Sequence, residues 1–106
     1  MLREVFKTVS EGRREEIALL TSQVGKKTGV RITVIDKDGV VISDSEKDPK
    51  VMENHAGRPE VKEAVSKGIG ESTRYSTTLK KDMLYVAVPI IDGRGEIEII
   101  VRTALP

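Results

Sequence analysis

Residues 31–43 of this 106-residue chain read RITVIDKDGVVIS, and their pattern is the clearest indication of its fold class. From Val30 onward the side chains alternate between two faces with a period of two, which is typical of a β-strand. Asp38-Gly39 is the dipeptide of tight hairpin turns, and Val40 to Ser43 reads as the returning strand. The stretch therefore predicts a β-hairpin.

A long amphipathic helix is expected before the hairpin. Apolar residues recur there at a spacing of about 3.6 residues, at Leu2, Phe6, Val9, Ile17, Leu20 and Val24. Lys26 and Lys27 suit the negative end of a helix dipole, and Gly29 suits a C-terminal cap. The pattern predicts one helix over residues 2–27, so that residues 1–28 form the helical part of a single domain.

Two short helices are expected after the hairpin. Asp48-Pro49 has the pattern of a helix N-cap followed by proline at the first helical position, which predicts a helical turn through Met52. A second helix is predicted over residues 59–67, with Gly68 at its end. Its buried side is expected to carry Val61, Ala64 and Val65.

Three more strands complete the prediction. Residues 72–76 read as a polar strand, and residues 77–82 as a polar loop. Residues 83–91 are apolar at nearly every position, which predicts a central strand covered on both faces. A hairpin turn at residues 92–95 leads into the last strand, residues 96–103.

The order of elements predicts an α+β domain with a five-stranded, mostly antiparallel sheet. The long helix is expected on one face of the sheet and the short helices on the other. A chain of this length fits one domain, so residues 1–106 are assigned to a single domain, with the sheet and short helices in residues 29–106.

Composition excludes several functions. Charged residues make up 33% of the chain at a net charge of +1, a balance that argues against a nucleic-acid surface. The chain has no cysteine and one histidine, His55, which argues against thiolate and multi-histidine metal sites. No serine lies in a nucleophile-elbow pattern. We therefore expect no catalytic residue, no metal and no cofactor. Scarce amide residues beside abundant Lys, Arg and Glu are typical of heat-adapted proteins.

The acidic residues after the hairpin have two interpretations. Asp44, Glu46 and Asp48 form a cluster that resembles a weak divalent-cation site. A solvated loop that contains one helix cap explains the same residues, and we favour it. His55 likewise suits either a pH sensor or a structural hydrogen-bonding residue, and we favour the structural role.

A few polar residues are left as candidates for ligand binding. Arg58 and Arg74 lie beside the predicted short helix and the polar strand, where two guanidinium groups would clamp a phosphate or carboxylate. A surface position or an ion pair is the more common role of each such arginine, and we favour it. The full candidate set is Asn54, His55, Arg58, Arg74 and Tyr85.

Several segments together resemble a known family. They are residues 31–41, Ser43-Asp44-Ser45, Met52–His55, Arg58–Val61, Thr73–Ser76 and Met83–Pro89, in this order. They resemble the extracytoplasmic PAS-like sensor domain, of the Cache type, found in phosphate-regulon-type sensor histidine kinases. The resemblance covers about the last three-quarters of the chain.

The resemblance implies a role in signalling. It implies membrane helices before and after the domain, an ATP-dependent histidine kinase inside the cell, and a sensor domain outside it that is not itself an enzyme. We expect a homodimer through the first helix at Leu2, Phe6 and Val9, because these residues extend beyond what one small domain covers. A small-anion or metabolite-binding domain and a free-standing PAS-like dimerisation module are the alternatives.

Overall fold

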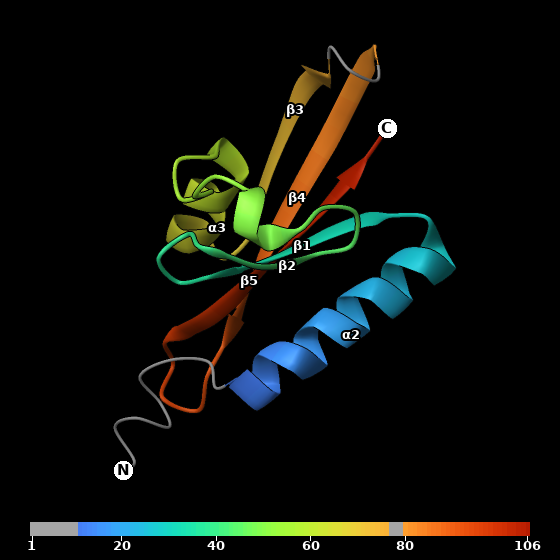
Figure 1. The fold of residues 1–106 in the computed structure, drawn as a ribbon. Helices are drawn as coiled ribbons and strands as arrows, with labels where there is room; N and C mark the ends of the chain where they lie inside the picture. The colour runs from blue at the N-terminus through green and yellow to red at the C-terminus, as the bar shows by residue number, and fades with distance from the viewer. Residues whose placement is uncertain (1–10, 77–79) are drawn as a thin grey trace.

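The computed structural model describes residues 11–76 and 80–106. Its elements are α2 (Glu11–Thr28), β1 (Arg31–Asp36), β2 (Val41–Asp44), the 3-10 helix η1 (Pro49–Val51), α3 (Pro59–Lys67), β3 (Gly70–Ser76), β4 (Lys81–Ile91) and β5 (Ile97–Leu105). The five strands form one sheet in the order β2-β1-β5-β4-β3, and every neighbouring pair is antiparallel (Figure 1). This confirms the predicted α+β architecture.

The two faces of the sheet carry different helices, as predicted. Ile17 of α2 packs with Val34 of β1 on one face. Val61 of α3 packs with Ile35 of β1 and Ile100 of β5 on the opposite face. Because consecutive side chains of a strand point to opposite faces, Val34 and Ile35 divide the core into two layers.

The two hairpin turns predicted from the sequence use the same device. In the β1–β2 turn, a side-chain oxygen of Asp36 accepts hydrogen bonds from the backbone N–H groups of Asp38 and Val40. In the β4–β5 turn, Asp92 accepts in the same way from the N–H groups of Arg94 and Glu96. Such side-chain acceptors satisfy the turn backbone locally, which explains why these turns were readable from sequence.

The helix ends also follow the sequence signals. Asp48 caps η1 by accepting from the N–H of Lys50 at 2.9 Å. Gly29 follows α2 at φ 71°, and Gly68 ends α3 at φ 84°, a conformation that glycine adopts without steric cost. The prediction for Val65 was wrong: its side chain is 53% exposed, and the buried positions of α3 are Glu60, Val61 and Ala64.

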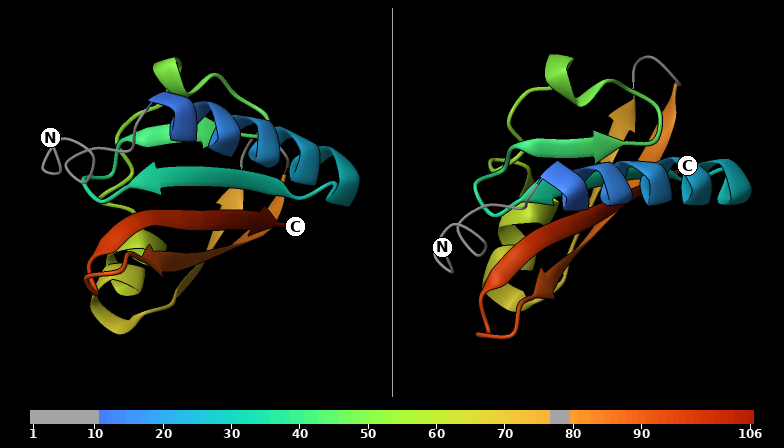
Figure 2. Two further views of the ribbon diagram at one scale, coloured as in Figure 1. Left: turned by 90° about the horizontal axis from the view of Figure 1, so that it is seen from below. Right: turned by 60° about the horizontal axis from the view of Figure 1, so that its bottom comes forward.

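The contact face of α2 differs from the predicted apolar stripe. Leu20 and Val24 are 58% and 44% exposed, whereas Thr21 is buried. The reason is the position of the helix, which packs on β2 and β1 and reaches β5 through the ion pair of Arg13 with Glu98 (Figure 2). On β2 it meets a polar residue, Ser43, whose hydroxyl lies 2.9 Å from that of Thr21.

The prediction for the apolar strand at residues 83–91 was wrong in two respects. This strand, β4, lies between β5 and β3, and β5 is the central strand of the sheet. Val88 and Ile90 are 42% and 44% exposed, because α2 does not extend over this part of the sheet. Met83 and Ala87, which point to the α3 side, are buried as expected.

Some predictions concern residues outside the described ranges. Leu2, Phe6 and Val9 lie there, as do residues 77–79 of the predicted polar loop. Across residues 11–76 and 80–106, none of the helices has the length and apolar character needed to cross a membrane.

Candidate functional site

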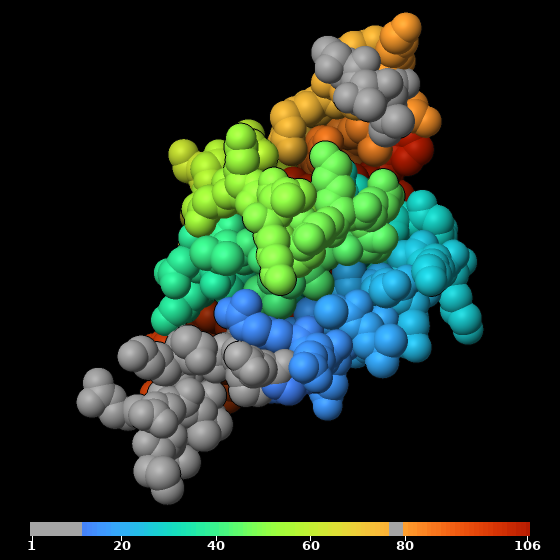
Figure 3. Space-filling model, viewed as in Figure 1, coloured from blue at the N-terminus to red at the C-terminus, as the bar shows by residue number. Residues whose placement is uncertain are grey.

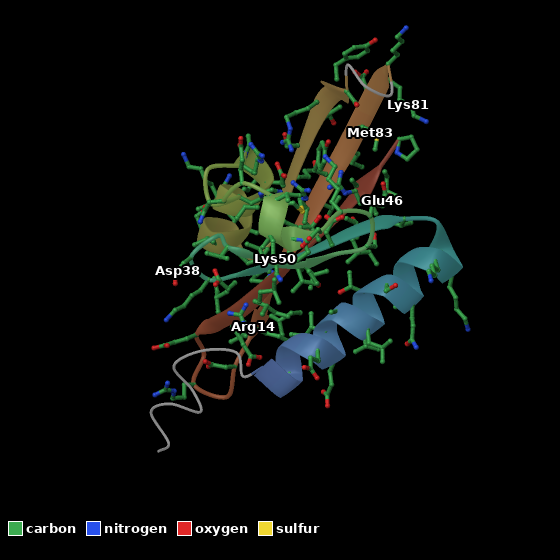
Figure 4. The ribbon with its side chains drawn as sticks, viewed as in Figure 1. Arg14, Asp38, Glu46, Lys50, Lys81 and Met83 are labelled. Carbon is green, nitrogen blue, oxygen red and sulfur yellow. The ribbon has the colours of Figure 1, made fainter. Side chains whose placement is uncertain are left out.

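A cavity of about 680 Å³ lies between the sheet and the β2–α3 loop, on the side of α3. The loop crosses in front of the sheet, as the space-filling view shows (Figure 3), and Glu46 and Lys50 mark it in Figure 4. Five of the lining residues are cations: Arg31, Lys47, Arg58, Arg74 and Arg102. The others are Asp48, Val51, Met52, Glu53, His55 and Tyr85.

The β2–α3 loop is held against the β1–β2 turn. The N–H of His55 donates to the carbonyl oxygen of Gly39 at 2.8 Å, and the side-chain amide of Asn54 donates to the carbonyl oxygen of Asp38 at 3.0 Å. Gly39 has a φ of 89° and lies so close to the loop that a Cβ would overlap Asn54 and Ala56. The β1–β2 turn therefore fixes the distance between the β2–α3 loop and the sheet.

The structure brings four of the five candidate ligand-binding residues to this cavity. His55, Arg58, Arg74 and Tyr85 line it, although they come from the loop and from two different strands. Asn54 does not line the cavity, because its side chain bonds the β1–β2 turn and the N–H of Ala56. His55 also has the structural role that we favoured, since its Nδ1 lies 2.7 Å from the carbonyl oxygen of Glu53.

A buried carboxylate lies behind the cavity. Glu60, in the first turn of α3, has a fully buried side chain. Arg74 of β3 donates to both of its oxygens, at 2.6 and 3.1 Å, and Arg102 of β5 donates to one of them at 3.2 Å. One carboxylate thus joins α3 to two strands that are not neighbours in the sheet.

The hydrogen-bond network continues to the other edge of the sheet. Arg102 also donates to the hydroxyl of Thr33 at 3.2 Å, and this hydroxyl donates to Asp44 at 2.7 Å. Asp44 accepts in turn from Nε of Arg31 at 3.2 Å. Three of the cavity cations, Arg31, Arg74 and Arg102, are therefore held in fixed orientations by buried partners, as binding groups need to be.

Tyr85 of β4 lies beside two of these arginines. The guanidinium carbon of Arg74 is 4.0 Å from the centre of its ring, and that of Arg102 is 5.0 Å away. Nε of Arg102 is buried and finds no hydrogen-bond acceptor among the residues that the structure describes. A buried donor of this kind costs free energy unless an acceptor is supplied.

The two carboxylates of the network, Glu60 and Asp44, are ionised at neutral pH because their pKa values are lowered. Burial by itself raises the pKa of Glu60, but the hydrogen bond and charge of Arg74 outweigh it, so this pKa lies below its usual range. Asp44 behaves alike: burial raises its pKa, but the hydrogen bonds from Thr33, the Glu46 N–H and Arg31 outweigh burial, so this pKa also lies below its usual range. Burial lowers the pKa of His55, so at neutral pH this side chain is uncharged.

Sequence reasoning missed three cations that line the cavity, Arg31, Lys47 and Arg102, and the carboxylate behind it, Glu60. Arg102 had a readable signal, because it occupies an inward position of a strand between Ile100 and Ala104, where a charge is unusual. Glu60 had none, since an acidic residue in a first helical turn is common on exposed surfaces.

Two residues of the acidic cluster, Asp44 and Asp48, make hydrogen bonds within the protein. Asp44 accepts from Thr33 and Arg31, and Asp48 caps η1. Within the described part of the chain, no group of three or more His, Cys, Asp or Glu side chains is arranged to hold a metal ion.

The fold is that of a Cache-type, PAS-like sensor domain. The sequence profile of the Single Cache-like family matches residues 9–103, so the chain belongs to the Single Cache-like family. It is a sensor domain of the Cache class. No curated protein matches the sequence.

Solved sensor domains share the fold. The sensor domain of the V. cholerae histidine kinase DctB superposes with a TM-score of 0.74 at 18% identity, covering 91% of this chain and 38% of its own. The E. coli DcuS sensor domain gives 0.67 at 17% identity, covering 91% and 77%. A Vibrio cholerae sensory box sensor histidine kinase gives 0.53 at 14% identity, covering 88% and 94%. This chain thus spans under half of the DctB chain.

Proposed function

We propose that this chain is the extracytoplasmic sensor domain of a membrane-bound sensor histidine kinase, and that it detects a small anion in the cavity beneath the β2–α3 loop. The observation that carries the ligand proposal is the buried Nε of Arg102 in a cavity lined by five cations. A phosphate or carboxylate supplies acceptors for such donors, and arginine binds both groups in a bidentate manner.

The position of Arg102 supports a relay to the membrane. Arg102 lies on β5, the last strand, so the cavity includes a side chain of the strand that completes the fold, and α2, the first described element, lies on the opposite face of the sheet (Figure 1). In the proposed receptor, membrane helices continue from both ends. Anion binding then shifts β5 relative to α2 and biases a two-state, ATP-dependent kinase.

The phosphate-regulon type of this kinase is part of the proposal and rests on the sequence resemblance alone. A free-standing PAS-like module is the competing proposal. Hydrophobic segments on both sides of this region in the full-length gene support the receptor, and their absence supports the free-standing module.

Anion binding is expected to raise the melting temperature. A ligand at a hundred times its dissociation constant adds about 2.7 kcal/mol of stability, which for a domain of this size corresponds to roughly 10 °C. The measurement is a thermal-shift series with inorganic phosphate and small carboxylates, against glycerol and against sodium chloride at equal ionic strength. Arg58→Gln, at the rim, is expected to weaken binding about tenfold.

The matched control for Arg58→Gln is Lys62→Gln. Lys62 is an exposed cation on α3 that does not line the cavity, so its loss changes the net charge equally. Equal weakening by the two variants would show nonspecific attraction. No thermal shift with any anion would remove the ligand from the proposal and leave the relay to be driven by something else.

We also propose that the receptor is a homodimer through its first helix. The exposed Leu19, Leu20 and Val24 of α2 support this, because they place apolar surface along the described part of that helix. The double variant Phe6→Glu, Val9→Glu is expected to reduce self-association in analytical ultracentrifugation while the circular dichroism spectrum stays the same. Thr8→Glu, off the apolar stripe, is the control, and unchanged sedimentation of the double variant would count against the dimer.

A further inference from the structure

The floor of the cavity, formed by the network of Arg31, Asp44, Glu60, Arg74 and Arg102, has more positive than negative charges. Two guanidinium groups, those of Arg74 and Arg102, share the single carboxylate of Glu60. The neighbouring Arg31 has its own carboxylate, since it pairs with Asp44 at 3.2 Å. Among the described residues the floor therefore carries one positive charge in excess.

The described residues of the cavity rim carry equal numbers of positive and negative charges. Its two cations are Lys47 and Arg58, and its two carboxylates are Asp48 and Glu53. Arg58 and Glu53 approach each other to 4.0 Å. The excess charge therefore belongs to the floor, where Nε of Arg102 is buried and has no acceptor among the described residues.

We infer that Glu60 is the specificity-determining residue of this cavity: by neutralising one of the two floor guanidinium groups, it selects ligands that place a single negative charge against Arg102 and Arg74. The inference rests on the proposed anion site and adds the charge of the ligand to it. A small molecule with one carboxylate fits this floor. A second carboxylate on the same ligand would find no further excess positive charge among the described residues of the floor or the rim.

Glu60 holds a constant negative charge at the floor because its carboxylate is fixed in position. The side chain is fully buried, and bidentate bonds from Arg74 fix its plane. The pKa of Glu60 lies below its usual range, so the carboxylate stays charged throughout the neutral range. A ligand therefore meets a constant charge at the floor.

The test compares two probes of equal carbon number, propionate with one carboxylate and malonate with two. Dissociation constants are measured at pH 7.5 and constant ionic strength by NMR titration, following the Arg102 Nε–H signal. Wild type is expected to prefer propionate. Glu60→Gln is expected to shift the preference toward malonate by at least about tenfold, because it exposes a second uncompensated guanidinium.

Removing a cation from the floor is expected to have the opposite effect to removing Glu60. Arg74→Gln leaves Arg102 paired one to one with Glu60, so propionate affinity is expected to fall about tenfold. The double variant Glu60→Gln, Arg74→Gln again has one excess charge, and it is expected to regain the wild-type affinity. This pair of variants keeps the test decisive if Glu60→Gln alone does not fold. Glu63→Gln, one turn along α3, is the control and leaves the preference unchanged.

The outcomes separate the two proposals. If the probes perturb Arg102 but the preference is the same in wild type and Glu60→Gln, and the double variant does not regain affinity, Glu60 is only a structural counter-ion and the anion site stands. If neither probe perturbs the Arg102 signal in any variant, both the anion site and this inference are overturned.

Discussion

Replacing Glu60 by alanine is expected to lower the free energy of unfolding by about 3–5 kcal/mol. The substitution leaves the guanidinium of Arg102, whose side chain is 4% exposed, without its carboxylate, and Arg74 loses a bidentate partner. Leaving a buried charge uncompensated costs more than the pair contributes. Urea denaturation followed by circular dichroism measures the change.

Glu63→Ala is the matched control for Glu60→Ala. Glu63 lies on the same helix, is 38% exposed in its side chain, pairs with Lys67 at 4.0 Å and accepts a hydrogen bond from the N–H of Glu71 at 3.1 Å. An exposed pair contributes between about 0 and 1 kcal/mol and a hydrogen bond about 1 kcal/mol, so the control is expected to lose about 1–2 kcal/mol, less than Glu60→Ala. A loss below about 1 kcal/mol in Glu60→Ala would contradict the structural importance of the buried network.

Gly70→Ala is expected to cost about 3 kcal/mol, the upper end of the usual cost of overpacking. Gly70 begins β3, and a Cβ there would overlap the carbonyl oxygen of Glu60 and lie 2.7 Å from the amide nitrogen of Ala64. Both contacts are to the backbone of α3, which cannot rotate away as a side chain can. Thermal and urea unfolding measure the loss.

Gly93→Ala is the control for Gly70→Ala, because a Cβ at Gly93 meets nothing within 4 Å. It is expected to stay within about 0.5 kcal/mol of wild type. Because Gly70 sets the distance between α3 and β3, Gly70→Ala is also expected to weaken the Glu60–Arg74 contact. Equal stabilities of the two alanine variants would refute the close approach of strand and helix.

Much of the fold was predictable because its signals are local. Asp36 and Asp92 each bond N–H groups two and four residues ahead, so the turns form from adjacent sequence. Gly68 and Asp48 end and begin helices by the same kind of short-range bonding. These choices depend on side chains within one turn of the chain, which a sequence displays directly.

The layer arrangement was only partly predictable. Leu20 and Val24 have the spacing of buried helix residues, yet they are exposed because α2 packs on β2 and β1. Residues 83–91 have the composition of a central strand, yet β5 has that place. A hydrophobic pattern indicates that a surface prefers to be buried, but it does not indicate which element packs against that surface.

Local sequence patterns were enough to predict the order of helices and strands, the hairpin turns, the helix ends and the two faces of β1, and to select His55, Arg58, Arg74 and Tyr85 as candidates. Their meeting in one cavity with Arg31 and Arg102, and the pairing of Glu60 with the arginines at its floor, depend on the tertiary structure. Arg74 and Arg102 lie 14 and 42 residues from Glu60 along the chain. Whether such distant charges meet depends on strand order and on the packing of α3 against β3, which bring together groups that no local pattern relates.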